Sequence, residues 1–598
     1  MLKALYDYGI QNGLAIPPGF MRKPIRGYIL LSAKGDYLGI QPCKEENIIC
    51  PDIGSLANGP DKCNPLAEKA EVILGEDGKK PDFFRQLLKD GGDIPEFQAC
   101  LRVLETPEIL QVIREEAKVR KIKGMDRITF RVGGHPLPEV EGVTAWWSDY
   151  RQRFSRDAGK KAGVRCLITG ELTTPLETVP TINGLQTVGG HSRGEALICF
   201  DKAAFQSYGL KKSANAPVSE EAFSVVKDAL NDLLAGSPAM YRRDKNRDFN
   251  PTAPVFAGLK FVHWYDCPLA PEEDPILPIF PGFAWEEEEP APVETPRTSA
   301  QADRVIRAVT SGEAPPKPDC RYHILLLSGA NGRVMIRRYE RGSYEELQRN
   351  LAQWKRDLSL TNQLGSGTIR PHKLLARLVR LMKNKNADNL MEQMKRELSG
   401  ITPAIILAIV NGTALPDTVA VRALAYIRSQ IYSEKDQAFI PDGIACQWLK
   451  VWLTRRGGNR NEEVSKMEYF NPGFPNAAYH CGALMAIYAD LQRTAMGEVN
   501  ASVVTRYYAS ASRTPTLVLG TLERMAGIYL GKLDRGMAYI FENRLNQEYA
   551  FFCPEEGRSL PQTLNLEEQS YFALGYRQMC AQITYDKLNR KANRTEES

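Results

Sequence analysis

The chain has 598 residues, of which 43% are hydrophobic and 25% are charged, a composition typical of folded globular domains. At roughly 150 residues per domain, this length predicts about three or four domains. The 77 Lys and Arg residues nearly balance the 72 Asp and Glu residues, and the net charge of +5 excludes a uniformly basic surface. A site for a polyanion therefore has to come from local clusters of cations.

The amino-terminal residues and the cysteines indicate a cytoplasmic protein. Met1–Phe20 lacks the basic start and continuous apolar run of a signal peptide. The longest aliphatic run, Ile401–Val410, is too short to span a membrane. The 12 cysteines are scattered, so we expect reduced thiols, and those before residue 101 match no common zinc spacing. We predict no metal and no cofactor.

The amino-terminal part, residues 1–267, is predicted to be a mixed α/β domain. Short strand-like runs, such as Arg26–Leu31 and Ala196–Phe200, are separated by turns rich in Gly and Pro. Residues 268–318 are rich in Pro and acids, including Glu286–Glu289. This composition is typical of a linker or a mobile loop.

The remainder is predicted to be a β-hairpin followed by helices. Two β-rich runs around Asn331-Gly332 predict a hairpin at 319–345 that returns to the amino-terminal domain. Apolar residues then recur at spacings of three and four, which predicts a helical region at 346–465 and a bundle at 466–598. The expected helices include Leu374–Met394, Val419–Ile431, Ala477–Leu491, Val503–Tyr508 and Thr516–Leu533. The predicted fold class is α+β, a mixed α/β amino-terminal region followed by an all-α carboxy-terminal helical bundle.

Aromatic and basic residues alternate between Trp146 and Arg165. Aromatic rings either stack on bases or anchor a core, and cations beside them can reach phosphates. For the rings, the core interpretation is the stronger one. The candidate aromatic and basic contacts are Trp146, Trp147, Arg151 and Arg153.

A glycine-rich stretch runs from Asn183 to Gly194. Its glycines allow close approach of a backbone to another molecule, and its polar side chains suit base edges or phosphates. It lacks the Lys-Ser/Thr of a P-loop and the glycine spacing of a dinucleotide fingerprint. A structural turn and a binding loop therefore both stay open. The residues of the candidate motif-reading loop are Asn183, Gly184, Gln186, Gly189, Gly190, His191, Ser192 and Arg193.

Several basic residues are predicted to contact a nucleic-acid backbone. Lys373, Arg377 and Arg380 share one face of a predicted helix, and no acid lies between Lys373 and Lys385 to neutralise them. The alternative is a solvated face. Arg455–Arg460 reads as a basic loop, either a phosphate contact or an exposed connector. The other predicted backbone contacts are Arg337, Arg338, Arg456, Arg493, Arg506 and Arg513.

No catalytic residues are predicted. The six histidines are widely spaced, without an HExxH motif, and no Gly-x-Ser-x-Gly elbow occurs. His480-Cys481 is better explained by packing at the start of a helix than by catalysis. The alternatives that stay open are a nuclease or nucleotide-dependent DNA-processing enzyme and a purely architectural scaffold.

Short motifs follow one another in an unusual order along nearly the whole chain. They are Leu5–Tyr8, Cys166–Glu171, Asn183-Gly184, Gly189-Gly190, Leu197–Phe200, Ala204-Phe205, Ser207–Gly209, Asn215–Ser219, Ala229–Asn231, Leu325–Arg337, Tyr479–Gln492, Arg506–Tyr508 and Ala511–Pro515. In this order they resemble the large subunit of the type I-C CRISPR Cascade, the Dvulg-subtype family. Val262-His263-Trp264 departs from the expected plainer apolar residue before the Trp, which affects no functional assignment.

The resemblance implies a non-catalytic subunit of an RNA-guided surveillance complex. Such a subunit recognises the protospacer-adjacent motif in duplex DNA, helps to unwind it and stabilises the displaced strand. The implied partners are the guide CRISPR RNA, double-stranded target DNA with its displaced single strand, the Cascade backbone and handle-binding subunits, a small subunit that matches the carboxy-terminal bundle, and a helicase–nuclease recruited in trans. The resemblance further implies that the small subunit can arise from an internal start, for which Met467 and Met485 are candidates.

Overall fold

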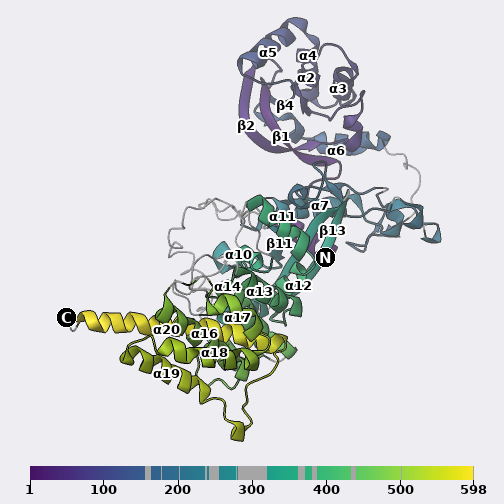
Figure 1. Cartoon of the computed structure of the whole chain (residues 1–598). Helices are drawn as coiled ribbons and strands as arrows, with labels where there is room; N and C mark the ends of the chain where they lie inside the picture. Colours follow the sequence, from purple (N-terminus) through teal and green to yellow (C-terminus); the bar gives the residue numbers. More distant parts are fainter. Residues whose placement is uncertain are drawn as a thin grey trace. The chain divides into compact units, whose positions relative to one another are not determined.

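The computed structural model describes residues 1–154, 163–176, 178–200, 202–205, 207–235, 239–241, 255–277, 279–280, 319–330, 332–360, 371–379, 387–431, 440–458, 460–497, 499 and 501–596. Contacts divide the chain into two compact units (Figure 1). Unit 1 comprises Met1–Pro180 and Ile198–Leu230, and unit 2 comprises Thr181–Leu197 and Asn231–Ser598. This division differs from the predicted boundary at residue 267, because part of the glycine-rich stretch belongs with the later strands and helices.

Unit 1 contains a five-stranded sheet in the order β2-β1-β4-β3, with β5 paired to β4. The strands are β1 (Phe20–Leu31), β2 (Tyr37–Pro51), β3 (Ala67–Lys69), β4 (Arg127–Val132) and β5 (His135–Pro136). β1 pairs antiparallel with β2 and parallel with β4, and β1 contains the predicted strand Arg26–Leu31, which is thereby confirmed. A separate two-stranded ladder joins β6 (Val164–Arg165) and β7 (Leu172–Thr173).

The helices α2 to α5 gather on one side of this sheet (Figure 1). The helices of unit 1 are α1 (Leu2–Gln11), α2 (Ala70–Ile73), α3 (Lys79–Asp90), α4 (Pro95–Glu105), α5 (Pro107–Val119) and α6 (Val143–Tyr150), and α7 (Glu220–Leu234) contributes residues to both units. α4 and α5 begin with Pro, which suits the first turn because its missing N–H needs no partner there. Their apolar faces pack with Phe84, Phe130 and Trp147 in one core.

Unit 2 contains a six-stranded sheet in the order β10-β11-β12-β13-β9-β8. The strands are β8 (Thr181–Ile182), β9 (Glu195–Ala196), β10 (Val255–Phe256), β11 (Leu259–Tyr265), β12 (Arg321–Ala330) and β13 (Arg333–Ser343). β12 and β13 pair antiparallel from Ala330↔Arg333 to Arg321↔Ser343, which confirms the predicted hairpin. The predicted strand Ala196–Phe200 is wrong beyond Ala196, because only Glu195–Ala196 pairs with neighbouring strands.

The beginning of the predicted 268–318 linker is folded. Asp274 is buried and bonds to His263 and Tyr265 of β11, and Ile276 and Phe280 lie in the core of unit 2. The prediction of a linker or mobile loop is therefore wrong for this part, whereas residues 281–318, with the acidic run, lie outside the described residues. The expectation of reduced thiols is also corrected, since Cys267 and Cys320 form a disulfide.

After β13, unit 2 is helical. The helices are α9 (Tyr344–Leu358), α10 (Pro371–Ala376), α11 (Ala387–Leu398), α12 (Thr402–Asn411), α13 (Asp417–Gln430), α14 (Gly443–Arg455), α15 (Glu462–Ser465), α16 (Ala477–Met496), α17 (Val503–Ala511), α18 (Pro515–Leu530), α19 (Arg535–Tyr549) and α20 (Leu566–Glu596). Polar side chains cap several starts; Asn476, for example, accepts a hydrogen bond from the Tyr479 N–H at 3.1 Å. The helices predicted around α13, α16, α17 and α18 are confirmed, and so is the α+β class.

The long helix α20 runs along α16 (Figure 1). The two backbones approach closely at Gly482 and Gly575, where an added Cβ would lie 2.0 Å from the carbonyl oxygens of Phe572 and Tyr479 respectively. Glycine is therefore required at both positions of this crossing. None of the described helices is long and apolar enough to cross a membrane.

Candidate nucleic-acid interface

The glycine loop, residues 183–194, connects β8 to β9 at one end of the six-stranded sheet. Ala196 of β9 bridges in parallel to Arg333 of β13, and its N–H donates to the Gly332 carbonyl at 2.9 Å. The loop is therefore tied to the turn of the β12–β13 hairpin. A rigid sheet thus positions the residues that the sequence singled out.

Two of the loop glycines have a structural role. The Gly190 N–H donates to the Leu185 carbonyl at 2.9 Å, and the loop backbone lies directly on β12. A Cβ added to Gly329 of β12 would lie 2.4 Å from the Gly190 Cα and N atoms, and one added to Gly189 would lie 3.0 Å from the Gly329 oxygen. The structural-turn interpretation therefore holds for Gly189 and Gly190, whose backbone is occupied by β12.

The polar side chains of the loop remain available. Leu185 and Val188 are buried, whereas Asn183, Gln186, His191, Ser192 and Arg193 are exposed. Asn183 is also held from behind, because its N–H donates to Asn231 Oδ1 at 2.9 Å. A fixed backbone with exposed amide, imidazole, hydroxyl and guanidinium groups can hydrogen-bond to base edges and phosphates.

Glu195 supports the loop from below, and the sequence did not single it out. It is fully buried, and its Oε1 accepts a hydrogen bond from the His191 N–H at 2.6 Å. Its Oε2 has no hydrogen-bond partner among the described residues. The buried Glu195 carboxylate, by accepting this hydrogen bond, fixes the turn at 191–194. In the sequence, only the four-residue spacing between His191 and Glu195 could have suggested this contact.

The arginines of β13 lie beside this loop in the sheet order. A β-bulge falls between the pairs Leu326↔Arg338 and Leu327↔Ile336, so Arg337 is the extra residue. Arg337 and Arg338 are both exposed. Arg337 Nε donates to Ser328 Oγ at 3.0 Å, and Arg338 lies 3.4 Å from Glu340. Both guanidiniums retain N–H groups that can face a phosphate.

The predicted basic stripe on one helix is not continuous. α10 ends at Ala376, so only Lys373 lies on it with its side chain exposed, and Arg377 lies in the following turn. Arg377 Nε donates to Asp442 Oδ2 at 3.1 Å, an acid 65 positions away in the sequence. The prediction that this cation has no acidic partner is therefore wrong, and Arg380 lies outside the described residues.

Two of the three arginines in the predicted basic loop at 455–460 bind a buried acid, and Arg456 is exposed. Arg455 is only 4% exposed, and its Nε donates to the buried Asp357 at 2.7 Å. Arg460 donates to the same carboxylate at 2.7 Å. Arg456 pairs with Glu567 and lies over the Trp452 ring. A backbone contact is therefore wrong for Arg455, whose charge is used by the core, and the connector interpretation describes this loop better.

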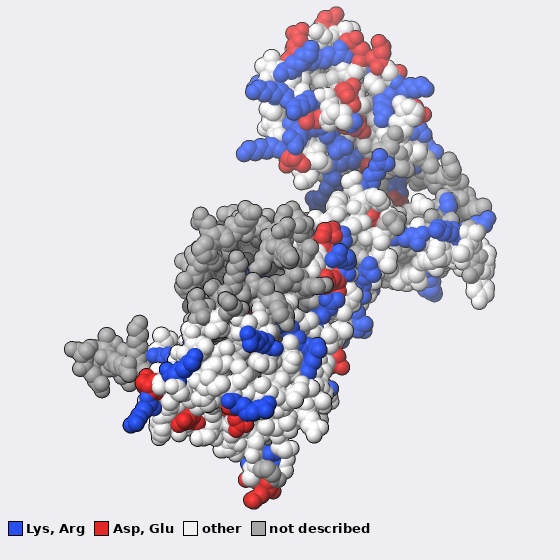
Figure 2. All heavy atoms as spheres, viewed as in Figure 1, with Lys and Arg blue, Asp and Glu red and all other residues white. Residues whose placement is uncertain are grey.

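The carboxy-terminal cations differ in their availability. Arg493 Nη2 lies 2.5 Å from Asp490 Oδ1, whereas Arg506 and Arg513 are exposed and have no acidic partner among the described residues. On the described part of the face in Figure 2, Lys and Arg form small separate groups with acids between them. Contacts to a polyanion would therefore be distributed over several cations.

The aromatic and basic stretch in unit 1 serves the core. Trp147 is fully buried and its Nε1–H donates to the Gly19 carbonyl at 2.6 Å. Arg151 pairs with Glu220, and Arg153 lies over the Tyr150 ring. Trp146 is half-buried against Phe97. A nucleic-acid contact is therefore wrong for Trp147, and the core interpretation of the rings is confirmed.

A basic turn that begins in the last turn of α5 was not singled out from the sequence. It is defined by Lys118, Arg120, Lys121 and Lys123, and all four side chains are exposed. Arg120 lies 3.4 Å from Glu116, but the three lysines have no acidic partner among the described residues. Four cations within six positions could have identified this turn from the sequence.

The histidines with carboxylate partners are also brought together only by the fold. His263 pairs with Asp274, His323 with Asp266, and His480 with Glu548, each at 2.7–2.9 Å. His480 and Cys481 are both buried at the start of α16, which agrees with packing. The four cysteines at 43, 50, 63 and 100 do not come together, and no group of metal ligands occurs among the described residues.

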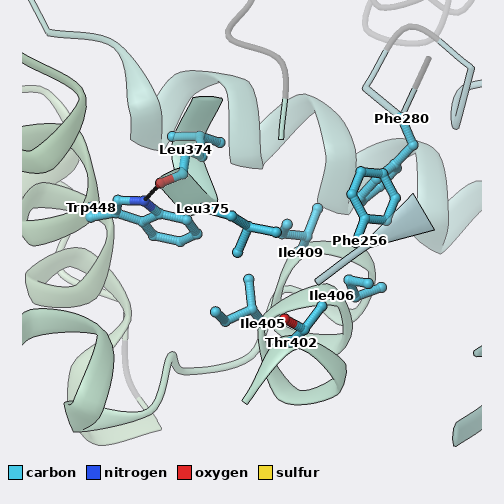
Figure 3. Close-up of a pocket in the computed structure, with 9 residues that line it drawn as sticks. All are labelled: Phe256, Phe280, Leu374, Leu375, Thr402, Ile405, Ile406, Ile409 and Trp448. Atoms are coloured by element: carbon cyan, nitrogen blue, oxygen red, sulfur yellow. Dashed lines mark hydrogen bonds between the residues drawn. The ribbon is translucent and has the colours of Figure 1, made fainter. Parts of the chain in front are cut away.

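A small cavity lies between the helices of unit 2. Its lining is almost wholly apolar and includes Leu375, Ile405, Ile409, Phe256 and Phe280 (Figure 3). Trp448 closes one side, with its Nε1–H donating to the Leu374 carbonyl at 2.7 Å. The cavity lacks convergent polar groups, so it is a packing space of the core rather than a substrate site.

These features define a class: an α+β protein with an exposed polar loop on a rigid sheet and dispersed cations, suited to binding nucleic acid. The chain belongs to the CRISPR-associated protein (Cas_Csd1) family, whose sequence profile matches residues 2–583. The resemblance to the type I-C large-subunit family is thereby confirmed. Family membership implies partnership with other CRISPR-associated proteins and with guide RNA. A comparison with curated proteins gives no match.

Proposed function

We propose that the chain is a non-catalytic large subunit of an RNA-guided type I-C surveillance complex. In this role it recognises a protospacer-adjacent motif in duplex DNA, helps to open the duplex, stabilises the displaced strand and recruits a helicase–nuclease. The complex acts in the cytoplasm. The observation that carries the proposal is the glycine loop of a Cas_Csd1 family member, with exposed polar side chains on a fixed backbone.

The loop suits a short reader of duplex DNA. The packing of Gly189 and Gly190 on β12 fixes the loop backbone, so its exposed polar side chains are available to a DNA groove in a defined arrangement. Gln186 and Arg193 offer donors to base edges, and Asn183 offers both a donor and an acceptor. Since base pairing with the guide reads the target sequence, the protein needs to read only a short flanking motif.

The exposed cations suit the strands after opening. Exchange of a DNA duplex for an RNA–DNA hybrid is nearly balanced in free energy, so modest contacts decide whether it proceeds. Arg337, Arg338, Lys373, Arg506 and Arg513 are exposed and supply such contacts. Each of three other cations already pairs with an acid and therefore contributes less to binding the strands: Arg377, Arg456 and Arg493.

The test of motif reading uses the assembled complex with its guide RNA. Gln186→Ala and Arg193→Ala should flatten the preference among duplexes that differ only in the flanking motif, while binding to a fully single-stranded target persists. Thr187→Ala, at an exposed neighbouring position, is the control. Unchanged motif preference in both variants would show that the reader lies elsewhere. A purified complex without RNA, and without DNA affinity at low salt, would refute the proposed function.

The proposal of a non-catalytic role is supported by the location of two His–carboxylate pairs. His263 and His480 are both buried with their carboxylates, where no phosphodiester reaches them. Purified protein should leave DNA intact with added magnesium or manganese and should not hydrolyse ATP. Either activity, if it persists through further purification and is absent from a mock preparation, would favour the alternative of a DNA-processing enzyme.

We also propose that an internal start at Met467, rather than Met485, produces the separate small subunit. Met485 lies inside α16, and a start there would delete Tyr479, His480 and Gly482. Tyr479 hydrogen-bonds to Gln578, His480 hydrogen-bonds to Glu548, and Gly482 packs against the backbone of α20. A start at Met467 retains them. Intact mass analysis of the complex should find a fragment beginning near residue 467, and Met467→Leu should abolish it; a fragment starting at 485 would contradict this.

A further inference from the structure

Two exposed aromatic side chains, Phe205 and Tyr208, lie in a segment of unit 1 that follows β9 in the sequence. Tyr208 is fully exposed at 101%, and Phe205 is 37% exposed. Phe205 contacts the half-buried Phe200 edge-to-face, with ring centroids 6.1 Å apart. Tyr208 has the highest exposed fraction among the large hydrophobic side chains of the described residues, so its whole ring is open to a partner.

The backbone holds this ring outward in an unfavourable conformation. Tyr208 has φ +58° and ψ 22°, the left-handed region that residues with a Cβ rarely adopt. Gly209 follows with φ +74°. Asn215 Nδ2 donates to the carbonyls of Leu210 at 3.3 Å and Lys212 at 3.0 Å, which fixes the segment that follows. Backbone strain around an exposed ring, held by hydrogen bonds, is characteristic of binding sites.

The charges around the ring indicate the kind of partner. Lys202, Lys211 and Lys212 are exposed, and the sequence from Lys202 to Ser219 contains no Asp or Glu. Lys202 and Lys211 have no acidic partner among the described residues. Aromatic rings flanked in the sequence by exposed cations match a single-stranded nucleic acid, whose bases stack on rings while its phosphates meet lysines.

We propose that Tyr208 and Phe205 stack on unpaired bases of a single-stranded nucleic acid, with Lys202 and Lys211 at its phosphates. None of these residues belongs to the glycine loop, and the proposal rests on the proposed function only in that such a strand is present. The strand is either the guide RNA or the displaced DNA, since both offer unpaired bases and phosphates.

Binding of the full-length protein to fluorescein-labelled single strands of DNA and RNA tests the stacking. Tyr208→Asn removes the ring and suits the left-handed backbone, so folding should persist. It should weaken binding roughly five- to a hundredfold, the range for loss of one stacked base. Tyr208→Phe should bind like the wild type. Tyr539→Asn, which removes a 64% exposed ring from α19, is the matched control and should have no effect.

Ultraviolet crosslinking of the assembled complex identifies the strand. A crosslink at Tyr208 in the complex with guide RNA alone assigns the site to RNA, and one that appears only with target DNA assigns it to the displaced strand. If the wild type binds nucleic acid with motif preference but Tyr208→Asn binds equally well, the stacking site alone is refuted. If Tyr208→Asn instead weakens assembly with partner subunits, the ring contacts protein and the proposal is overturned. If the wild type binds no nucleic acid, the proposed function itself fails.

Discussion

At the scale of single residues, Asp357 organises the charges of the helical part of unit 2. It is fully buried and accepts hydrogen bonds from Gln353, Arg455, Arg460 and Ser465. Burial alone would raise the pKa of Asp357, but the two arginines outweigh it and hold the pKa below its usual range. The carboxylate is therefore charged at neutral pH and joins α9 to α14 and α15.

Asp357→Asn should destabilise the protein by about 3–5 kcal/mol, because it leaves the buried Arg455 guanidinium without a counter-charge. Urea denaturation followed by circular dichroism measures the change. The contribution of Asp357 is fully present above its unfolded pKa and is lost as pH falls through the lower folded pKa, so the difference from wild type should shrink in acid. Glu542→Gln, at an exposed position of α19, should change little. Equal stability of Asp357→Asn and wild type would contradict this account.

Lys450 is the opposite case, a buried cation with no carboxylate partner among the described residues. It is fully buried in α14, and its Nζ donates to the Ser359 carbonyl. Burial lowers the pKa of Lys450 to about 8, against the weaker attraction of Glu468 and Asp357. The protonated form is therefore less favourable in the folded protein than in the unfolded chain.

Lys450→Met should raise the melting temperature at pH 7, because an apolar side chain of similar length removes the buried charge. For wild type, stability should rise as pH increases from about 8 toward the unfolded pKa near 10.4, since the unfolded chain then binds more protons. Subtracting the pH profile of Lys450→Met isolates this rise from other titrations. A difference that does not vary between pH 7 and 10 would show that Lys450 is not desolvated.

At the scale of elements, the glycine loop and the β12–β13 hairpin act as one piece. Gly190 of the loop lies on Gly329 of β12, and Ala196 bonds to Gly332 beside the hairpin turn. No side chain intervenes between the two backbones at Gly329. The position of the exposed loop side chains therefore depends on Gly329, which has no side chain that could itself contact DNA.

Gly329→Ala should displace the loop, because its Cβ would lie 2.4 Å from backbone atoms of Gly190 that cannot rotate away. We expect weaker discrimination between flanking motifs, with the overall fold retained. Duplex binding by the assembled complex and a thermal melt measure the two effects. Gly520→Ala is the matched control, because it lies on the exposed face of α18 with nothing within 4 Å of its Cβ. It should keep motif preference and be neutral or slightly stabilising. Retained preference in Gly329→Ala would mean that the loop does not read DNA.

At the scale of the whole molecule, patterns within one element were predictable and long-range pairings were not. The period of apolar residues predicted α16 and α18, and Asn331-Gly332 predicted the hairpin. No local pattern indicated that Asp442 pairs with Arg377 or that Asp357 receives Arg455, because the partners are 65 and 98 positions apart. The sequence therefore located groups of cations, but whether each cation is available to a partner depends on acids elsewhere in the chain.

This distinction makes a prediction for the salt dependence of DNA binding. With a net charge of only +5, affinity should depend on individual exposed cations rather than on the field of the whole protein. Arg513→Gln should weaken binding of all duplex sequences alike and reduce the slope of log affinity against log salt by about 1, because one phosphate contact is lost. Titrations between about 50 and 200 mM salt measure this slope. Arg349→Gln on α9, where the side chain is 71% exposed and 4.0 Å from Glu346, is the control with an unchanged slope. If both variants reduce the slope equally, the charge acts at long range and Arg513 has no specific contact.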